Sequence, residues 1–233
     1  MRVSLCPSET AAARESSCRR VRRGSLRPFG VLAALVLCQL AFSHVTAAPS
    51  RYLVRWVDDG DTIVLEGGER VRYLGINAPE IAHGDKPGEP YGNEARRFNR
   101  SLVLGCRVNL EFGERRRDVH GRLLAYVFLE DGTFVNGELV RVGYAHLLRR
   151  QACLRYWKLL LTLQRQALKE KRGIWSLPAV EPEDFYLGNR SSWVFHRPDC
   201  PFGLSMAPGN RIRFQSRYEA FFRGFSPCRR CRP

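Results

Sequence analysis

The protein has 233 residues, of which 44% are hydrophobic, and a formal net charge of +15 at pH 7. This length predicts one or two domains, and the apolar share excludes a chain too polar to form a packed core. The charge favours a polyanionic partner such as nucleic acid or an anionic membrane, although a soluble basic protein with a solvated surface has the same composition.

The positive charge is concentrated at the two ends of the chain. Residues 1–48 carry seven Arg against two Glu, and residues 186–233 carry nine Arg against two acidic residues. Residues 49–185 carry 22 Lys and Arg against 19 acidic residues. The sequence therefore predicts a nearly balanced main body with basic flanks.

The N-terminal segment has the pattern of a secretory signal. Residues 19–23 read Arg-Arg-Val-Arg-Arg, an apolar run follows over residues 29–42, and Val45 and Ala47 suit the −3 and −1 positions of a cleavage site. We expect residues 1–47 to be a cleaved signal peptide, so that the mature protein is exported to the periplasm or outside the cell. The alternative is a membrane anchor over residues 29–42, although a spanning helix needs about 20 apolar residues.

The pattern from residue 52 to residue 176 predicts a small barrel. Alternating and β-branched runs between tight turns predict strands, and apolar residues at intervals of three and four predict helices. In chain order we expect strands at 52–57, 62–65 and 70–76, a helix at 93–104, a strand at 107–112, a charged loop at 115–118, a strand at 123–129, and helices at 135–142 and 154–171. Five strands with a helix inserted after the third predict a mainly β fold with helices, in the form of an OB-type five-stranded barrel.

A second unit follows a short linker. Residues 178–185 are rich in proline and acidic residues, which is typical of a linker between domains. We therefore expect residues 48–177 to form the OB-fold domain and residues 186–233 to form a small α+β module.

Residues suited to phosphate and metal chemistry gather at three points of the expected barrel. Asp61 lies in the Asp-Asp-Gly-Asp turn between the first two strands, Arg72 and Glu80 lie in and after the third strand, and Arg122 lies before the fifth strand. A hard cation takes oxygen ligands, and the planar guanidinium of arginine matches two phosphate oxygens. Each residue alone is ordinary for a turn or a solvated strand, but together they favour a functional site.

The motifs around these residues resemble the staphylococcal nuclease family over about residues 52–176. The matching motifs are Asp59-Gly-Asp-Thr62, the run from Arg72 to Glu80, Tyr91-Gly-Asn-Glu-Ala95, the Asp118 to Arg122 segment, Leu124-Ala-Tyr126, the Val135 to Val140 helix and Ile174-Trp175. The resemblance implies an OB-fold enzyme that hydrolyses DNA and/or RNA by means of a metal-activated water.

The resemblance also implies a calcium site. Its ligands would be the carboxylate of Asp61, the side-chain oxygen of Asn77 and the backbone carbonyl of Ala78. Asn77 stands where the family commonly has an aspartate. Because the amide keeps an oxygen but loses a charge, we expect weaker calcium binding than in the family.

Further residues match the family's catalytic and substrate-binding positions. Arg72 and Arg122 would clamp the phosphate, Glu80 would position or deprotonate the attacking water, and Lys86 would contact the substrate from a loop. The stacking tyrosines of the family prototype are not matched in residues 143–150, so base preference does not follow from the resemblance.

Near the C-terminus, four residues have the spacing of a zinc site. His196 and Cys200 are separated by three residues, and Cys228 and Cys231 by two. Two close pairs of such ligands suit tetrahedral zinc, and a unit of this size builds so little core that a structural metal is expected. The alternative is a disulfide among the three cysteines, which export would permit.

The same segment resembles the metal-binding domain of the Ada DNA-repair protein over about 40 residues. His196 stands in place of that family's first cysteine, which can accept a methyl group from damaged DNA, so we do not expect methyl transfer. DNA binding stays open as a role for the module, because it is basic and rich in aromatic residues. For Cys106 and Cys153, a disulfide and two buried thiols are both open.

The leading interpretation is therefore an exported, calcium-dependent nuclease with a structural zinc ion. Its expected partners are DNA and/or RNA, with no permanent membrane association, and nothing in the sequence demands more than a monomer. Two alternatives remain, namely a non-catalytic nucleic-acid-binding protein and a surface-anchored component of DNA uptake.

Overall fold

The computed structural model describes residues 51–149, 154–178 and 182–233. The expected signal peptide and membrane anchor lie outside these residues, as does Cys153. Residues 49–233 group into one compact unit, in which a barrel and a smaller sheet can be distinguished. Among the described residues, no helix combines the length and the apolarity that crossing a membrane would require.

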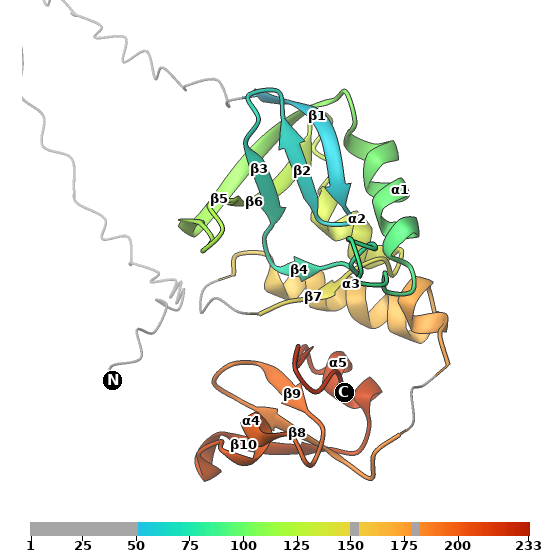
Figure 1. Ribbon diagram of the computed structural model, residues 1–233, viewed down its shortest axis with the longest axis vertical. Coiled ribbons are helices and arrows are strands. Elements are labelled where there is room, and N and C mark those ends of the chain that lie inside the picture. The colour runs from blue at the N-terminus through green and yellow to red at the C-terminus, as the bar shows by residue number, and fades with distance from the viewer. Residues whose placement is uncertain (1–50, 150–153, 179–181) are drawn as a thin grey trace, which may run out of the picture. The chain divides into compact units, whose positions relative to one another are not determined.

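The barrel is closed and five-stranded, as the sequence pattern predicts (Figure 1). Its strands are β1 (Arg51–Asp59), β2 (Thr62–Leu65), β3 (Arg70–Tyr73), β5 (Arg107–Arg117) and β6 (Leu123–Leu129), in the order β1-β2-β3-β6-β5. The first three form an antiparallel meander, β3 pairs with β6 in parallel, and antiparallel pairing of β5 with β6 and with β1 closes the barrel. The alternating apolar residues of these strands, such as Ile63 and Val71, are fully buried inside it.

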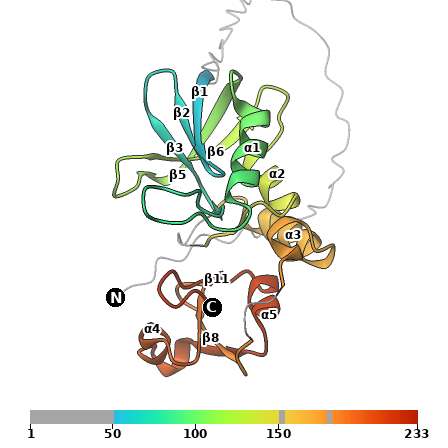
Figure 2. The same ribbon diagram turned by 45° about the vertical axis from the view of Figure 1, so that its right-hand side comes forward.

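Four helical elements also belong to this part of the chain. They are α1 (Gly92–Val103), α2 (Val135–Arg141), α3 (Trp157–Lys169) and the short 3-10 helix η1 (Gly173–Ser176). The helix α1 lies beside β1 in both views of the molecule (Figures 1 and 2). The buried Asn136 of α2 replaces missing strand partners, because its amide accepts a hydrogen bond from Val127 N at 2.9 Å and donates one to Leu74 O at 2.9 Å.

The third expected strand, over residues 70–76, is divided in two. β3 ends at Tyr73, and a separate strand β4 (Ile76–Asn77) pairs with β7 (His146–Leu147). Gly75 between them has a φ of 80°, which glycine adopts without the steric cost that a Cβ would bring. The sequence pattern missed this break because the apolar residues continue through it.

Two other expectations are corrected. The charged loop expected at 115–118 is wrong, because β5 continues through Arg117, which pairs with Leu123 and donates a hydrogen bond from Nη1 to Gly121 O at 2.7 Å. The helix expected at 154–171 is shorter and spans Trp157–Lys169. Both differences arise at element ends, where pairing partners decide the boundary rather than local pattern.

The C-terminal part of the chain forms a small α+β unit. Its strands are β8 (Tyr186–Asn189), β9 (Val194–His196), β10 (Arg211–Phe214) and β11 (Ser226–Pro227), in the order β10-β8-β9-β11, and its helices are α4 (Pro201–Leu204), α5 (Arg217–Phe222) and the 3-10 helix η2 (Pro208–Asn210). Its buried core is mostly aromatic and includes Tyr186, Phe195, Phe214 and Phe225. Ser216 caps α5, since its Oγ accepts a hydrogen bond from Glu219 N at 3.1 Å.

Candidate functional site

A buried ion pair lies at the tip of the β1–β2 hairpin. Arg72 Nη2 lies 2.9 Å from Asp61 Oδ2, and the two residues are only 8% and 4% exposed. The same carboxylate oxygen accepts a hydrogen bond from Ala78 N at 2.6 Å. Folding thus brings together residues from the hairpin turn, β3 and the segment after β4, which the sequence predicted to meet.

The guanidinium of Arg72 is held on several sides. Its Nη1 donates hydrogen bonds to Tyr73 O at 2.8 Å and Ile76 O at 2.9 Å, and its Nη2 also donates to Asn77 Oδ1 at 2.9 Å. These contacts span the break between β3 and β4, so the break itself shapes the arginine's surroundings. Arg72, expected to clamp a phosphate, is therefore in direct contact with two expected calcium ligands, Asp61 and Asn77.

Burial makes the Asp61 carboxylate a poor place for an uncompensated negative charge. Loss of hydration raises the pKa of Asp61 to about 7, although the charge of Arg72 and the hydrogen bond from Ala78 N oppose this rise. The nearby charge of Asp59 raises the pKa further. A carboxylate in this position gains from a proton or from a bound cation.

Asp59 is a site residue that the sequence reasoning did not single out. Its Oδ1 accepts a hydrogen bond from Asp61 N at 2.9 Å, and its backbone carbonyl accepts one from Asn99 Nδ2 at 3.2 Å. The fully buried Asn99 also accepts a hydrogen bond from Tyr73 OH at 2.8 Å, so α1 anchors the hairpin tip. The signal available in the sequence was the doubled aspartate of the Asp-Asp-Gly-Asp turn.

The residues present fit a hard cation. The donor set contains two neighbouring carboxylates, Asp59 and Asp61, and a backbone carbonyl at Ala78, all of them oxygen ligands of the kind that calcium prefers. In this arrangement the amide of Asn77 links Arg72 to Ala78, because its Nδ2 donates a hydrogen bond to Ala78 O at 3.1 Å. The buried carboxylate of Asp61, with the carboxylate of Asp59 beside it, is the feature that a cation would satisfy.

Three other predicted site residues lie outside this hydrogen-bonded group. Glu80 and Lys86 are exposed, and Arg122 is partly buried. In the part of the chain that the structure describes, no hydrogen bond or ion pair joins any of them to Asp61 or Arg72. Glu80 is nonetheless only two residues beyond Ala78. Its backbone packs closely against Gly92, where a Cβ would lie 2.4 Å from Glu80 O.

Arg122 is held by the turn that precedes β6. Its Nε donates a hydrogen bond to Asp118 Oδ2 at 2.8 Å, and Asp118 Oδ1 accepts hydrogen bonds from Arg122 N and His120 N. Although burial opposes it, these hydrogen bonds hold the pKa of Asp118 below its usual value. Leu123 of β6 pairs with Val71 of β3. Arg122, which directly precedes β6, therefore lies beside the strand that carries Arg72.

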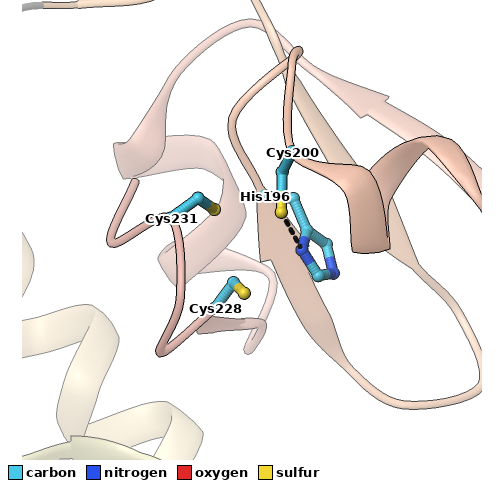
Figure 3. A group of neighbouring side chains, drawn as sticks. All are labelled: His196, Cys200, Cys228 and Cys231. Atoms are coloured by element: carbon cyan, nitrogen blue, oxygen red, sulfur yellow. Dashed lines mark hydrogen bonds between the residues drawn. The ribbon is translucent and has the colours of Figure 1, made fainter.

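The C-terminal unit contains a second constellation. Figure 3 shows the side chains of His196, Cys200, Cys228 and Cys231 directed toward one another, and their ligand atoms all lie within 4.8 Å of one another. Cys200 Sγ lies 3.4 Å from His196 Nδ1. One nitrogen and three sulfur donors at this separation suit a tetrahedral zinc ion, whose bonds to sulfur are about 2.3 Å long.

The surroundings of these four residues also fit zinc. Burial lowers the pKa of His196, which favours the neutral imidazole that a metal requires. Backbone N–H groups of Arg197 and Arg230 point at the sulfurs of Cys231 and Cys228, at 3.3 and 3.4 Å. All three cysteines of the cluster are free thiols here, so the disulfide alternative is not found.

Cys106 is exposed and free, so the expectation of a buried thiol at this position is wrong. The thiol of Cys106 donates a weak hydrogen bond to Leu102 O, with Sγ at 3.5 Å from that oxygen. Because Cys106 is a free thiol, its disulfide with Cys153 is not found in the structure, and Cys153 itself lies outside the described residues.

The closed five-stranded barrel carries an acidic hairpin tip and a buried arginine, which are the residue types that bind a hard cation and a phosphate. The model of the staphylococcal nuclease homologue family matches residues 70–177, and that of the metal-binding domain of Ada matches residues 180–233. The chain belongs to the staphylococcal nuclease family.

Several characterised proteins are similar to this chain. A thermonuclease of Staphylococcus intermedius is 37% identical over 127 residues, which are 53% of this chain and 75% of that protein. A thermonuclease of Staphylococcus hyicus is 34% identical over 128 residues, covering 54% of this chain and 75% of that protein. Endonuclease YncB of Bacillus subtilis is 37% identical over 123 residues, covering 51% of this chain and 58% of its own.

Proposed function

We propose that this protein is a metal-dependent nuclease that hydrolyses phosphodiester bonds in DNA and/or RNA. The observation that carries the proposal is the buried Asp61–Arg72 pair at 2.9 Å, beside the carboxylate of Asp59 and the carbonyl of Ala78. This arrangement provides oxygen ligands for a cation and a fixed guanidinium for a phosphate within one hydrogen-bonded group. The family membership of the chain agrees with it.

The residues divide the work of hydrolysis among them. Asp61, the Ala78 carbonyl and Asn77 would hold calcium, with the carboxylate of Asp59 beside them, and the bound ion would neutralise charge on the phosphate and lower the pKa of water. Arg72 and Arg122 bind the phosphate oxygens, which gather negative charge in the transition state. Glu80 is exposed and close in sequence to Ala78, so it is free to orient the attacking water or to accept its proton. Lys86 contacts the substrate from the loop before α1.

A cation held by Asp61 would change the partners of Arg72. The Nη atoms of Arg72 contact four protein acceptors, and one of these acceptors is the Asp61 carboxylate. The Asp61 carboxylate would then be shared between the cation and the guanidinium, and an Nη hydrogen of Arg72 would become available to a phosphate. Cation binding and phosphate binding are therefore expected to be cooperative.

The enzyme assay that tests this function uses the chain from residue 48 with single-stranded DNA and RNA, with calcium, with magnesium and without added divalent cation. Cleavage with calcium is the expected result. Arg72→Ala and Glu80→Ala should each reduce kcat by about 10²–10³, the usual effect of removing one transition-state donor or base. Binding of nucleic acid with no cleavage under any of these conditions would leave a non-catalytic binding protein as the function.

We also propose that the protein is exported and processed. The arginine-rich start, the apolar run over residues 29–42 and the small residues at 45 and 47 support cleavage after Ala47. N-terminal sequencing of the native protein should return Ala48 from the periplasm or the medium. An unprocessed chain in the membrane fraction would instead support the surface-anchored component of DNA uptake.

The division into a nuclease domain over residues 48–177, a linker over 178–185 and a zinc module over 186–233 is part of the proposal. The separate sheet and the His/Cys cluster of the C-terminal unit support it. A monomer is the expected state, which sedimentation of the purified chain can test.

A further inference from the structure

One basic and aromatic surface lies outside the residues assigned above. Trp56 of β1 is 45% exposed, although a large aromatic side chain gains free energy from burial. The guanidinium carbons of Arg96 and Arg100, both from α1, each lie 5.5 Å from the centre of the Trp56 ring. Arg55, next to it in β1, is also exposed. We call these four residues the Trp56 surface.

A β-bulge turns two successive residues of β1 toward solvent. Val54 pairs with Leu65 and Trp56 pairs with Val64, so that Arg55 is an extra residue on its strand. Val54 and Val57 remain buried, while Arg55 and Trp56 are both exposed. Without the bulge, strict alternation would place neighbouring side chains on opposite faces of the strand. The bulge therefore puts a cation and an aromatic ring together on the outside of the barrel.

The arginines of this surface lack acidic partners. Within the described residues, Arg55, Arg96 and Arg100 form no ion pair with a carboxylate, whereas their neighbour Arg97 pairs with Glu94 at 2.9 Å. Arg96 is instead oriented by a hydrogen bond from its Nε to Val57 O at 3.2 Å. Three cations without carboxylates around an exposed ring favour a partner that carries negative charge and flat apolar faces.

This surface is connected to the candidate active site by both elements that form it. Trp56 precedes Asp59 by three residues, which corresponds to about 10 Å of strand. Asn99, which lies in α1 between Arg96 and Arg100, donates the hydrogen bond that holds the Asp59 carbonyl. A strand of nucleic acid whose phosphate lies at the hairpin tip can therefore extend along β1 and α1 to reach Trp56.

We propose that the Trp56 surface is a subsite for single-stranded nucleic acid, in which one base of the strand flanking the cleaved bond stacks on Trp56 while Arg55, Arg96 and Arg100 contact its phosphates. Such pairing of an aromatic platform with cations is the general chemistry of single-strand binding, and an OB fold engages about 4–16 nucleotides. The site around Arg72 accounts for only one phosphate. This inference rests on the proposed nuclease function, because it assumes that the strand passes through that site.

The binding test uses a 20-nucleotide single-stranded phosphorothioate DNA, which resists cleavage, and measures Kd by fluorescence anisotropy. Trp56→Ala should raise Kd about tenfold, the typical effect of losing one stacked base. Trp56→Phe, which retains a ring, should recover most of the affinity. Circular dichroism melting confirms that each variant is folded. Equal Kd values for the wild type and Trp56→Ala would overturn the proposal, as would equal weakening by Ala and Phe.

The arginines provide an independent measurement with a matched control. For single strands, each phosphate contact contributes about 0.7 to the slope of log K against log salt concentration. Arg55→Ala, Arg96→Ala and Arg100→Ala should each reduce that slope, whereas Arg97→Ala, on the same helix but paired with Glu94, should not. If Arg97→Ala has the same effect as the other three, the contribution is general surface charge and the subsite is refuted.

Substrate length separates this inference from the nuclease function itself. Trp56→Ala should lower kcat/KM for a 20-nucleotide strand about tenfold more than kcat/KM for a dinucleotide, because only the longer strand reaches the ring. If the wild type neither binds nor cleaves nucleic acid, the nuclease function fails. If it cleaves both substrates and Trp56→Ala affects them equally, only the subsite fails. Trp56-dependent binding to phosphatidylserine vesicles without any effect on DNA binding would assign the surface to a membrane and refute it.

Discussion

The Asp61–Arg72 pair gives a sharp test of how the site is held together. Arg72→Met removes the charge but keeps a long apolar side chain. The substitution leaves the Asp61 carboxylate, whose side chain is only 6% exposed, without its ion-pair partner. It also removes the hydrogen-bond donors of three acceptors, Tyr73 O, Ile76 O and Asn77 Oδ1. Removing one partner of a buried pair typically costs about 3–5 kcal/mol, because the other charge stays buried without compensation. We expect a loss of that size in the free energy of unfolding at pH 9, where the Asp61 carboxyl of the wild type, with its pKa of about 7, is ionised.

A double-mutant cycle separates the stranded charge from the lost packing. Asp61→Asn retains an acceptor for Ala78 N, at 2.6 Å in the wild type, but carries no charge. Introducing Arg72→Met into Asp61→Asn should therefore cost at least about 1 kcal/mol less than introducing it into the wild type, within the range of coupling measured for contacting residues. The cycle is measured by urea unfolding at pH 9 without added divalent cation, so that Asp61 is ionised in the wild type. If the two costs are equal, the charges are not coupled, and our reading of the pair is wrong.

The pair also determines how the Asp61 carboxylate meets a cation. Arg72 opposes the effect of burial on the pKa of Asp61, so its removal should raise that pKa above about 7. At pH 7 more of the carboxyl would then be protonated, and calcium would have to displace that proton. Isothermal titration of Arg72→Met should show proton release on calcium binding that is larger than in the wild type. No change in proton release would contradict this electrostatic account.

Three further perturbations follow from single contacts. Asn136→Leu leaves two buried backbone groups without hydrogen-bond partners, at a cost of about 1–3 kcal/mol each. Urea unfolding should therefore show that the free energy of unfolding falls by about 2–6 kcal/mol. A decrease below about 1 kcal/mol would mean that water replaces the amide. Gly60→Ala places a Cβ 2.6 Å from that of Ala78. The clash should lower the free energy of unfolding by about 1–3 kcal/mol and, by displacing the hairpin tip, should also lower kcat. Thermal melting and kinetics measure the two effects, and an unchanged kcat would contradict this prediction. Cys228→Ser should abolish binding of one zinc ion per chain, as measured by metal analysis. It should also destabilise the C-terminal sheet, because binding of structural zinc contributes about 10–16 kcal/mol in zinc-finger peptides. Retention of zinc by the variant would remove Cys228 from the ligand set.

The sequence by itself determined the type of fold and predicted the members of the two constellations. Alternation with period two marks the barrel strands, because one face of each is buried and the other is not. The spacing of His196, Cys200, Cys228 and Cys231 predicts a metal cluster, because two close pairs of such ligands are typical of tetrahedral zinc sites. Family motifs placed Asp61 and Arg72 in one site. All of these are signals carried by residues close together along the chain.

Only the tertiary structure decided how those residues are arranged. The break at Gly75 separates β3 from β4, and Arg72 bridges that break to reach Asp61. Gly75 is a local signal for such a break, but the apolar residues on either side of it favour one continuous strand. The role of Asp59 in supporting Asp61 depends in the same way on how the hairpin tip packs against α1.

The Trp56 surface shows the same limit. Its ring comes from β1 and two of its arginines from α1, 40 and 44 residues later in the chain. Patterning along either element predicts which face is buried, but it does not say which exposed residues of one element meet those of another. That information resides in barrel closure and in the bulge at Arg55, because side-chain neighbours across elements are set by packing and register rather than by local sequence.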